Sequence, residues 1–138
     1  MNVLLVEPDV LLAELYERSL QPAGHEVASV RGAQQAVMAA DETPPDIVIL
    51  EPLLALHNGV EFLYEFRSYT EWSGIPIVLL TRNAAAFESR YRMMQAELGI
   101  CQIVAKHALL SGAVTLPQLV ARHGGRRHAA ACSKRIAA

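Results

Sequence analysis

The chain has 138 residues, of which 52% are apolar and 19% charged, and its formal net charge at pH 7 is −2. These values predict one globular domain with a substantial core and exclude a disordered or fibrous chain. No apolar run approaches the roughly 18 residues of a membrane span, and the acidic start of the chain argues against a signal peptide. We therefore expect a cytoplasmic protein that does not enter a membrane.

Charge is distributed unevenly along the chain. Residues 1–121 contain seven Lys and Arg against 14 carboxylates, whereas residues 122–138 contain five Lys and Arg and no carboxylate. An acidic body argues against nucleic-acid binding by the domain itself. We expect a domain over residues 1–123 and a basic, flexible tail over residues 124–138. Cys101 and Cys132 match no metal or redox spacing and are expected to be idle thiols.

Short apolar runs alternate with helical patterns. The run 3–6 is typical of a parallel strand covered on both faces, and Asp9 is the expected cap of the helix that follows. One apolar stripe of that helix should be buried, and it consists of Leu11, Leu12, Leu15 and Tyr16. The further expected elements are strands at 25–30, 47–50, 75–80 and 100–105, and helices at 33–40, 60–69 and 84–98.

The end of the domain is less regular. Residues 109–114 separate the fifth strand from the next helix start, at Thr115. Gly124 and Gly125 should end that helix after about two turns, which is short. Elsewhere, Phe62, Phe66 and Trp72 are expected in the core.

This alternation predicts a doubly wound α/β fold with a parallel sheet and helices on both faces. Such sheets bind ligands beyond the carboxyl ends of their strands. The candidate site therefore consists of the residues that end or follow strands: Glu7, Pro8, Asp9, Glu51, Thr81, Arg82 and Lys106.

These residues resemble the landmarks of a bacterial response-regulator receiver domain over about residues 1–107. The stretch PDIVILEPLLALHNG is similar to the family's third strand and active-site loop. Glu7 matches the first of the family's acidic pair, Thr81 its Thr or Ser, and Lys106 its lysine, while Gly59 and Gly99 match two of its glycines. The resemblance implies a CheY-like, flavodoxin-like (βα)5 fold, a three-layer sandwich with strand order 2-1-3-4-5. It also implies a site at which Mg²⁺ and the lysine assist phosphoryl transfer from a histidine kinase to an aspartate.

Four positions depart from the family pattern. Glu51 stands in place of the phosphate-accepting aspartate, and Pro8 in place of the second acidic residue, which binds Mg²⁺ directly. His107 replaces a proline, so the peptide bond before it is expected to be trans, and Ile103 replaces the aromatic ring of the switch. Together these changes indicate a site retired from phosphoryl transfer, which binds no cofactor or metal ion.

We therefore expect an atypical, stand-alone receiver domain that is no enzyme and binds protein partners of a signalling pathway without being phosphorylated. The expected surface comprises the fourth helix, the fifth strand and the fifth helix, where receivers dock partners or form homodimers. Glu51, opposite Lys106 and near Thr81, either mimics the acyl phosphate or forms a purely structural pair. Two alternatives remain: a working phosphoacceptor with residual autophosphatase chemistry at Glu51 or Asp9, and a regulator that binds nucleic acid through the basic tail. Arg82 is expected to bridge to Glu51, cover the pocket or point into solvent, and His57 and His107 are expected in loops.

Overall fold

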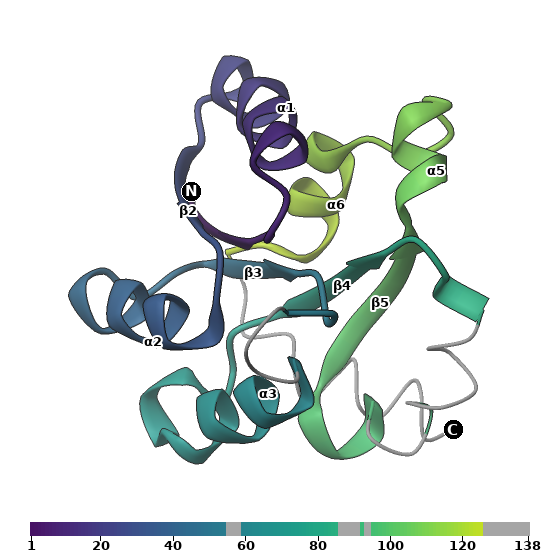
Figure 1. Ribbon diagram of the computed structural model, residues 1–138. Coiled ribbons are helices and arrows are strands. Elements are labelled where there is room, and N and C mark those ends of the chain that lie inside the picture. The colour runs from purple at the N-terminus through teal and green to yellow at the C-terminus, as the bar shows by residue number, and fades with distance from the viewer. Residues whose placement is uncertain (55–58, 86–91, 93–94, 126–138) are drawn as a thin grey trace.

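The computed structural model describes residues 1–54, 59–85, 92 and 95–125. Its sheet is parallel and has the strand order β2-β1-β3-β4-β5, which confirms the predicted fold class (Figure 1). The strands are β1 Asn2–Val6, β2 Glu26–Val30, β3 Ile47–Leu50, β4 Ile77–Thr81 and β5 Ile100–Ala105. Strands β1, β3 and β4 lie inside the sheet and consist almost entirely of buried aliphatic residues, as expected when helices cover both faces.

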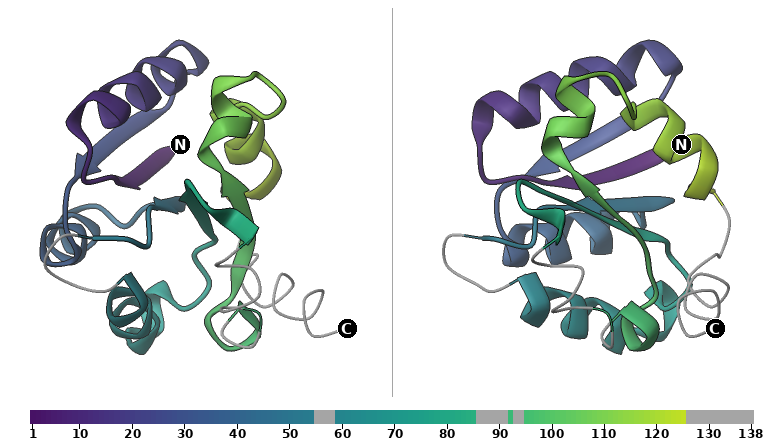
Figure 2. Two further views of the ribbon diagram at one scale, coloured as in Figure 1. Left: turned by 45° about the vertical axis from the view of Figure 1, so that its right-hand side comes forward. Right: turned by 90° about the vertical axis from the view of Figure 1, so that its right-hand side faces the viewer.

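Helices form a layer on each face of the sheet (Figures 1 and 2). One core cluster joins the sheet to α1 (Val10–Leu20) and α6 (Leu116–His123), and the other joins it to α2 (Ala33–Glu42) and α3 (Gly59–Ser68). Two short 3-10 helices, η1 (Gln21–Ala23) and η2 (Thr70–Trp72), follow α1 and α3. In η2 the indole of Trp72 stacks on the ring of Phe66 with 5.0 Å between centroids, which confirms its predicted place in the core.

Helix α1 begins where its cap was predicted, but it buries only part of the predicted stripe: Tyr16 is buried and Leu12 partly buried. The Asp9 carboxylate accepts hydrogen bonds from the backbone N–H groups of Leu11 and Leu12. Leu11 is 77% exposed and Leu15 is 50% exposed, so the prediction that both are buried is wrong. The sheet instead contacts the face one residue further round the helix, which presents Ala13, Tyr16 and Leu20.

The segment after β5 contains a short helix that the sequence did not indicate. Helix α5 (Lys106–Leu110) follows β5 directly, so His107 is helical rather than part of a loop, and its peptide bond to Lys106 is trans. Thr115 caps α6 in a capping box with Gln118, as the predicted helix start requires.

Three expectations concern segments outside the described residues. Of the helix expected at 84–98, the structure describes residues 84–85, 92 and 95–98 as helical. Gly99 follows in the left-handed conformation, with φ 67°, as expected after a helix end. His57 and the tail 126–138 are not described.

The idle-thiol prediction is wrong for Cys101, which is disulfide-bonded.

Candidate functional site

The structure brings four predicted site residues to the carboxyl edge of the sheet. Glu7 follows β1, Glu51 follows β3, Thr81 ends β4 and Lys106 follows β5. These strands are neighbours in the sheet, so residues that are far apart in the sequence converge. All four residues are buried.

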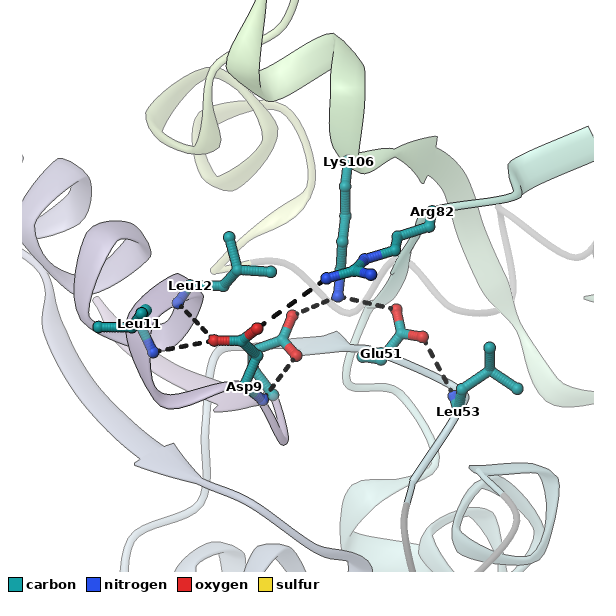
Figure 3. A network of polar contacts seen from close by, with 8 residues as sticks. Asp9, Leu11, Leu12, Glu51, Leu53, Arg82 and Lys106 are labelled. Atoms are coloured by element: carbon teal, nitrogen blue, oxygen red, sulfur yellow. Dashed lines mark hydrogen bonds and ion pairs between the residues drawn. The ribbon is translucent and has the colours of Figure 1, made fainter.

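Lys106 lies between two carboxylates (Figure 3). Its Nζ is 2.7 Å from Oε1 of Glu7 and 3.3 Å from Oε2 of Glu51. Lys106 begins α5, and its side chain runs back from that helix toward the strand ends. When both carboxylates are ionised, this buried trio carries a net charge of −1.

Backbone groups bind the outer oxygens of the same carboxylates. The N–H of Asp9 donates to Oε2 of Glu7 at 3.2 Å, and the N–H of Leu53 donates to Oε1 of Glu51 at 3.4 Å. Burial raises the pKa of the Glu51 carboxyl and the Glu7 charge raises it further, whereas the Lys106 ammonium and the Leu53 hydrogen bond oppose them; the net pKa shift is upward. Glu51 therefore holds its proton more tightly than an exposed glutamate does.

An exposed ion pair lies over the buried trio. Nη2 of Arg82 is 3.9 Å from Oδ2 of Asp9, and both side chains reach solvent. Of the three places expected for Arg82, the structure shows the solvent-exposed one: its side chain is 74% exposed, and its guanidinium lies near Asp9 rather than Glu51 (Figure 3). As the cap of α1 and the partner of Arg82, Asp9 links the first helix to the end of β4.

Two hydroxyl groups are buried in this region without a hydrogen-bond partner among the described residues: Oγ1 of Thr81 and the phenol oxygen of Tyr16. Burial, together with the charges of Glu7, Glu51 and Asp9, raises the pKa of Tyr16 to about 12, against a smaller opposing effect of Arg82. Sequence reasoning placed Tyr16 in the core and missed its electrostatic link to the site. The sequence did contain a sign of this link: Tyr16 carries a phenol group on the buried side of α1, and α1 begins next to the site.

The remaining predicted positions contribute no ligand atoms. Pro8 is partly exposed and has no polar side-chain atom, and Ile103 packs against the core cluster that contains α2 and α3. His107 is exposed on α5. Among the described residues, no group of three or more His, Cys, Asp or Glu side chains is placed to hold a metal ion.

Gly59 holds the end of the loop that follows β3. Its N–H donates to the carbonyl of Pro52 at 3.0 Å. A Cβ at this position would lie 2.5 Å from that carbonyl oxygen and 2.6 Å from the Cα of Pro52. Glycine is therefore required for α3 to start so close to Glu51.

The response regulator receiver domain family matches residues 3–112 of the chain. The chain belongs to this family. Receiver domains are, as a rule, signalling modules and not enzymes. This chain has the parallel sheet and the residues at the strand ends that led us to expect the family. In the described part of the chain, no helix is long and apolar enough to cross a membrane.

Curated relatives resemble this receiver domain over part of their length. The probable transcriptional regulatory protein TcrX of Mycobacterium tuberculosis is 32% identical over 84 residues, which are 61% of this chain and 35% of that protein. The DNA-binding response regulator MtrA of Mycolicibacterium paratuberculosis is 35% identical over 80 residues, 58% of this chain and 34% of that protein. The chain thus matches about a third of the length of these relatives.

Solved structures share the fold. The chemotaxis protein CheY4 of Vibrio cholerae superposes with a TM-score of 0.69 at 22% identity, covering 81% of this chain and 94% of that one. At this identity the likeness shows the fold alone.

Proposed function

We propose that this receiver domain acts in two-component signal transduction as a protein-binding module that does not require phosphorylation. The observation that supports this is the position of Lys106, whose ammonium group already lies within ion-pair distance of both Glu7 and Glu51. The cation that would neutralise an incoming phosphoryl group is therefore paired inside the protein.

Glu51 is central to the proposal because it stands where the family has its phosphate-accepting aspartate. The extra methylene of glutamate carries the carboxylate outward, and the group that it reaches is the Lys106 ammonium. Oγ1 of Thr81, which in the family bonds the phosphoryl group, makes no hydrogen bond to Glu51. We therefore favour a constitutive structural pair over mimicry of the acyl phosphate.

The family implies a Mg²⁺ ion at this site, but the residues present do not fit one. Mg²⁺ requires close to octahedral coordination by oxygen atoms. The inner oxygens of Glu7 and Glu51 face an ammonium group, and Pro8 supplies no ligand where the family has a carboxylate. We propose that the domain works without metal or other cofactor and has no catalytic turnover.

The proposed partner is a protein of a signalling pathway in the cytoplasm, bound through the last helices and the fifth strand. Of that surface the structure describes β5, α5 and α6, and α5 is an addition next to the site. Because Lys106 is the first residue of α5, the Glu7–Lys106–Glu51 contacts fix the start of this helix. A fixed α5 would present the same docking surface at all times.

An amide NMR titration with Mg²⁺ and beryllofluoride, a mimic of the acyl phosphate, tests the proposal. We expect no shifts at Glu51, Thr81 or Lys106 in the natural chain. The matched control is the double variant Pro8→Asp/Glu51→Asp, which restores both family carboxylates and should respond. Saturable shifts in the natural chain would show that its pocket still takes metal and phosphate.

A second candidate function is suggested by the names of the relatives, since MtrA is a DNA-binding response regulator. The acidic body of this chain leaves its basic tail as the segment that would contact DNA. Binding through the tail predicts an affinity that falls steeply with salt and is lost when residues 124–138 are removed. Fluorescence anisotropy with labelled duplex DNA measures both effects.

A further inference from the structure

Cys101, the second residue of β5, is disulfide-bonded. The chain contains two cysteines, so the partner within the chain is Cys132. Cys101 lies at the start of β5, whereas the Glu7–Lys106–Glu51 site lies beyond the end of that strand. The disulfide therefore joins the basic tail, residues 124–138 with four Lys and Arg and no carboxylate, to the opposite edge of the sheet from the candidate site.

Cys101 occupies an irregular position on an edge strand. β5 lies at the edge of the sheet, beside β4 (Figure 1). Ile77 of β4 pairs with Ile100 and Val78 pairs with Gln102, so Cys101 is the extra residue where the register shifts. The extra residue of a β-bulge is left out of the ladder, and its side chain is re-aimed. Cys101 is partly buried and belongs to neither core cluster of the described residues, which places it at the margin of the fold.

The described chain ends close enough for the tail to reach Cys101. Gly125 lines a hollow together with Pro76, which directly precedes β4. β4 is the neighbour of β5, and neighbouring strands are about 4.8 Å apart. Seven residues lead from Gly125 to Cys132, and an extended chain of that length spans about 23–25 Å. The bond therefore requires no rearrangement of the described fold.

Contacts and charges also direct the tail toward β5. Oε1 of Gln102, the residue after Cys101, is 2.9 Å from Nε2 of His123 at the end of α6, so the tail starts from a point held on β5. Asp46 and Glu71 line the hollow beside Gly125. Two arginines follow Gly125 in the sequence, and their charges are opposite to those of these carboxylates.

We propose that Cys101 and Cys132 form a reversible redox site, which ties the basic tail to the edge of β5 in the oxidised chain and releases it in the reduced chain. A dithiol reductant opens the bond: one of its thiolates attacks a sulfur of the disulfide, and its second thiol resolves the mixed disulfide. The reductant leaves as a cyclic disulfide, and the protein receives two electrons and two protons as two thiols. Because neither core cluster contains Cys101, reduction frees the tail without unfolding the domain.

Counting free thiols after equilibration in redox buffers tests the bond. The natural chain is equilibrated with oxidised or with reduced dithiothreitol, denatured, alkylated with N-ethylmaleimide and measured by intact mass. We expect no label on the oxidised chain and a label on both cysteines of the reduced chain. The matched control, Cys132→Ser, should be labelled at Cys101 in both buffers. Labelling of both cysteines after oxidation, or a disulfide between two chains, would overturn the proposal.

Limited proteolysis with trypsin separates a reversible tie from a structural bond, because the Lys and Arg of the tail are its cleavage sites. Reduction should speed cleavage within the tail at least about tenfold, since a released tail is always open to the protease. Far-UV circular dichroism should stay unchanged, and Cys132→Ser should be cleaved at the fast rate in both buffers. Equal cleavage rates for the oxidised and reduced natural chain, or loss of the dichroism signal on reduction, would contradict the proposed release.

Discussion

The ammonium group of Lys106 is enclosed by protein and lies between the Glu7 and Glu51 carboxylates. Removing a charge from water is costly, and attraction to a partner offsets this cost when the geometry is good. Lys106 forms ion pairs with both carboxylates, and each carboxylate also accepts one backbone N–H. The three side chains therefore depend on one another for stability.

Replacing Lys106 with methionine keeps most of the side chain's volume but removes its charge. Two buried carboxylates then face each other without a cation, and we expect the free energy of unfolding to fall by about 3–5 kcal/mol. Urea unfolding at pH 7 measures this loss. The control, Arg18→Met at low protein concentration, removes an exposed ion pair and should change stability by no more than about 1 kcal/mol. A loss no larger than that of the control would mean that the trio contributes nothing beyond an exposed pair.

The raised pKa of Glu51 predicts a specific pH dependence. A carboxyl whose pKa is higher in the folded than in the unfolded chain stabilises the fold when it is protonated. Its contribution is fully present below the ordinary pKa of 4.5 and is lost as pH rises through the raised folded value. Glutamine does not ionise, so Glu51→Gln should not lose stability in this way. As pH rises from 4.5 through the raised pKa of Glu51, we expect the free energy of unfolding of this variant to fall less than that of the natural chain.

Urea unfolding of both proteins from about pH 4 to pH 7 measures the difference. Glu14→Gln is the control, because Glu14 is exposed on α1 and its replacement should leave the profile unchanged. Parallel profiles for Glu51→Gln and the natural chain would show that Glu51 ionises as an exposed glutamate does.

Between elements, one arginine joins three segments on the α3 side of the sheet. The guanidinium of Arg67 in α3 donates to the carbonyls of Trp72 and Ser73 around η2, and to those of Leu98 and Gly99 just before β5. Burial lowers its pKa to about 10. These carbonyls belong to η2 and its C-cap and to the segment that leads into β5, so the arginine fixes where the chain turns into β5.

Arg67→Met should lower the free energy of unfolding by about 3 kcal/mol, because several carbonyls lose a charged donor at once. Arg67→Lys should recover little of this loss, since one ammonium group does not reproduce the planar fork of donors. Chemical denaturation measures both variants, with Arg31→Met, at an exposed position, as the control. A lysine variant as stable as the natural chain would show that charge, and not the shape of the donor, holds these segments.

A second feature at the level of the secondary-structure elements is the N-terminal cap of α6. Thr115 accepts the N–H of Gln118, whose side chain accepts the N–H of Thr115. Thr115→Ala should cost about 1 kcal/mol of stability, and Thr115→Ser, which keeps the hydroxyl, should cost much less. Thermal unfolding of the two variants separates the loss of the capping hydrogen bond from the change in side-chain volume. If both variants lose the same stability, the capping hydrogen bond is not the cause.

At the scale of the whole molecule, the apolar strand runs and their alternation with helices were enough to predict the fold. The convergence of Glu7, Glu51, Thr81 and Lys106 also followed, because strand order determines which strand ends are neighbours. The Lys106–Glu7 contact did not follow, because it depends on α5 starting at Lys106, and no local pattern indicated that helix. Similarly, Leu11 and Leu15 fit a buried stripe as well as Ala13 and Leu20 do, and the rotation of α1 on the sheet decided between them.

The central claim is that this receiver domain works without accepting a phosphoryl group. The most direct measurement is the intact mass of the chain after incubation with acetyl phosphate and Mg²⁺, beside the Pro8→Asp/Glu51→Asp variant. We predict that the natural chain keeps its mass, whereas the variant gains one phosphoryl group. A phosphoryl adduct on the natural chain, lost when Glu51 or Asp9 is replaced by alanine, would contradict the account.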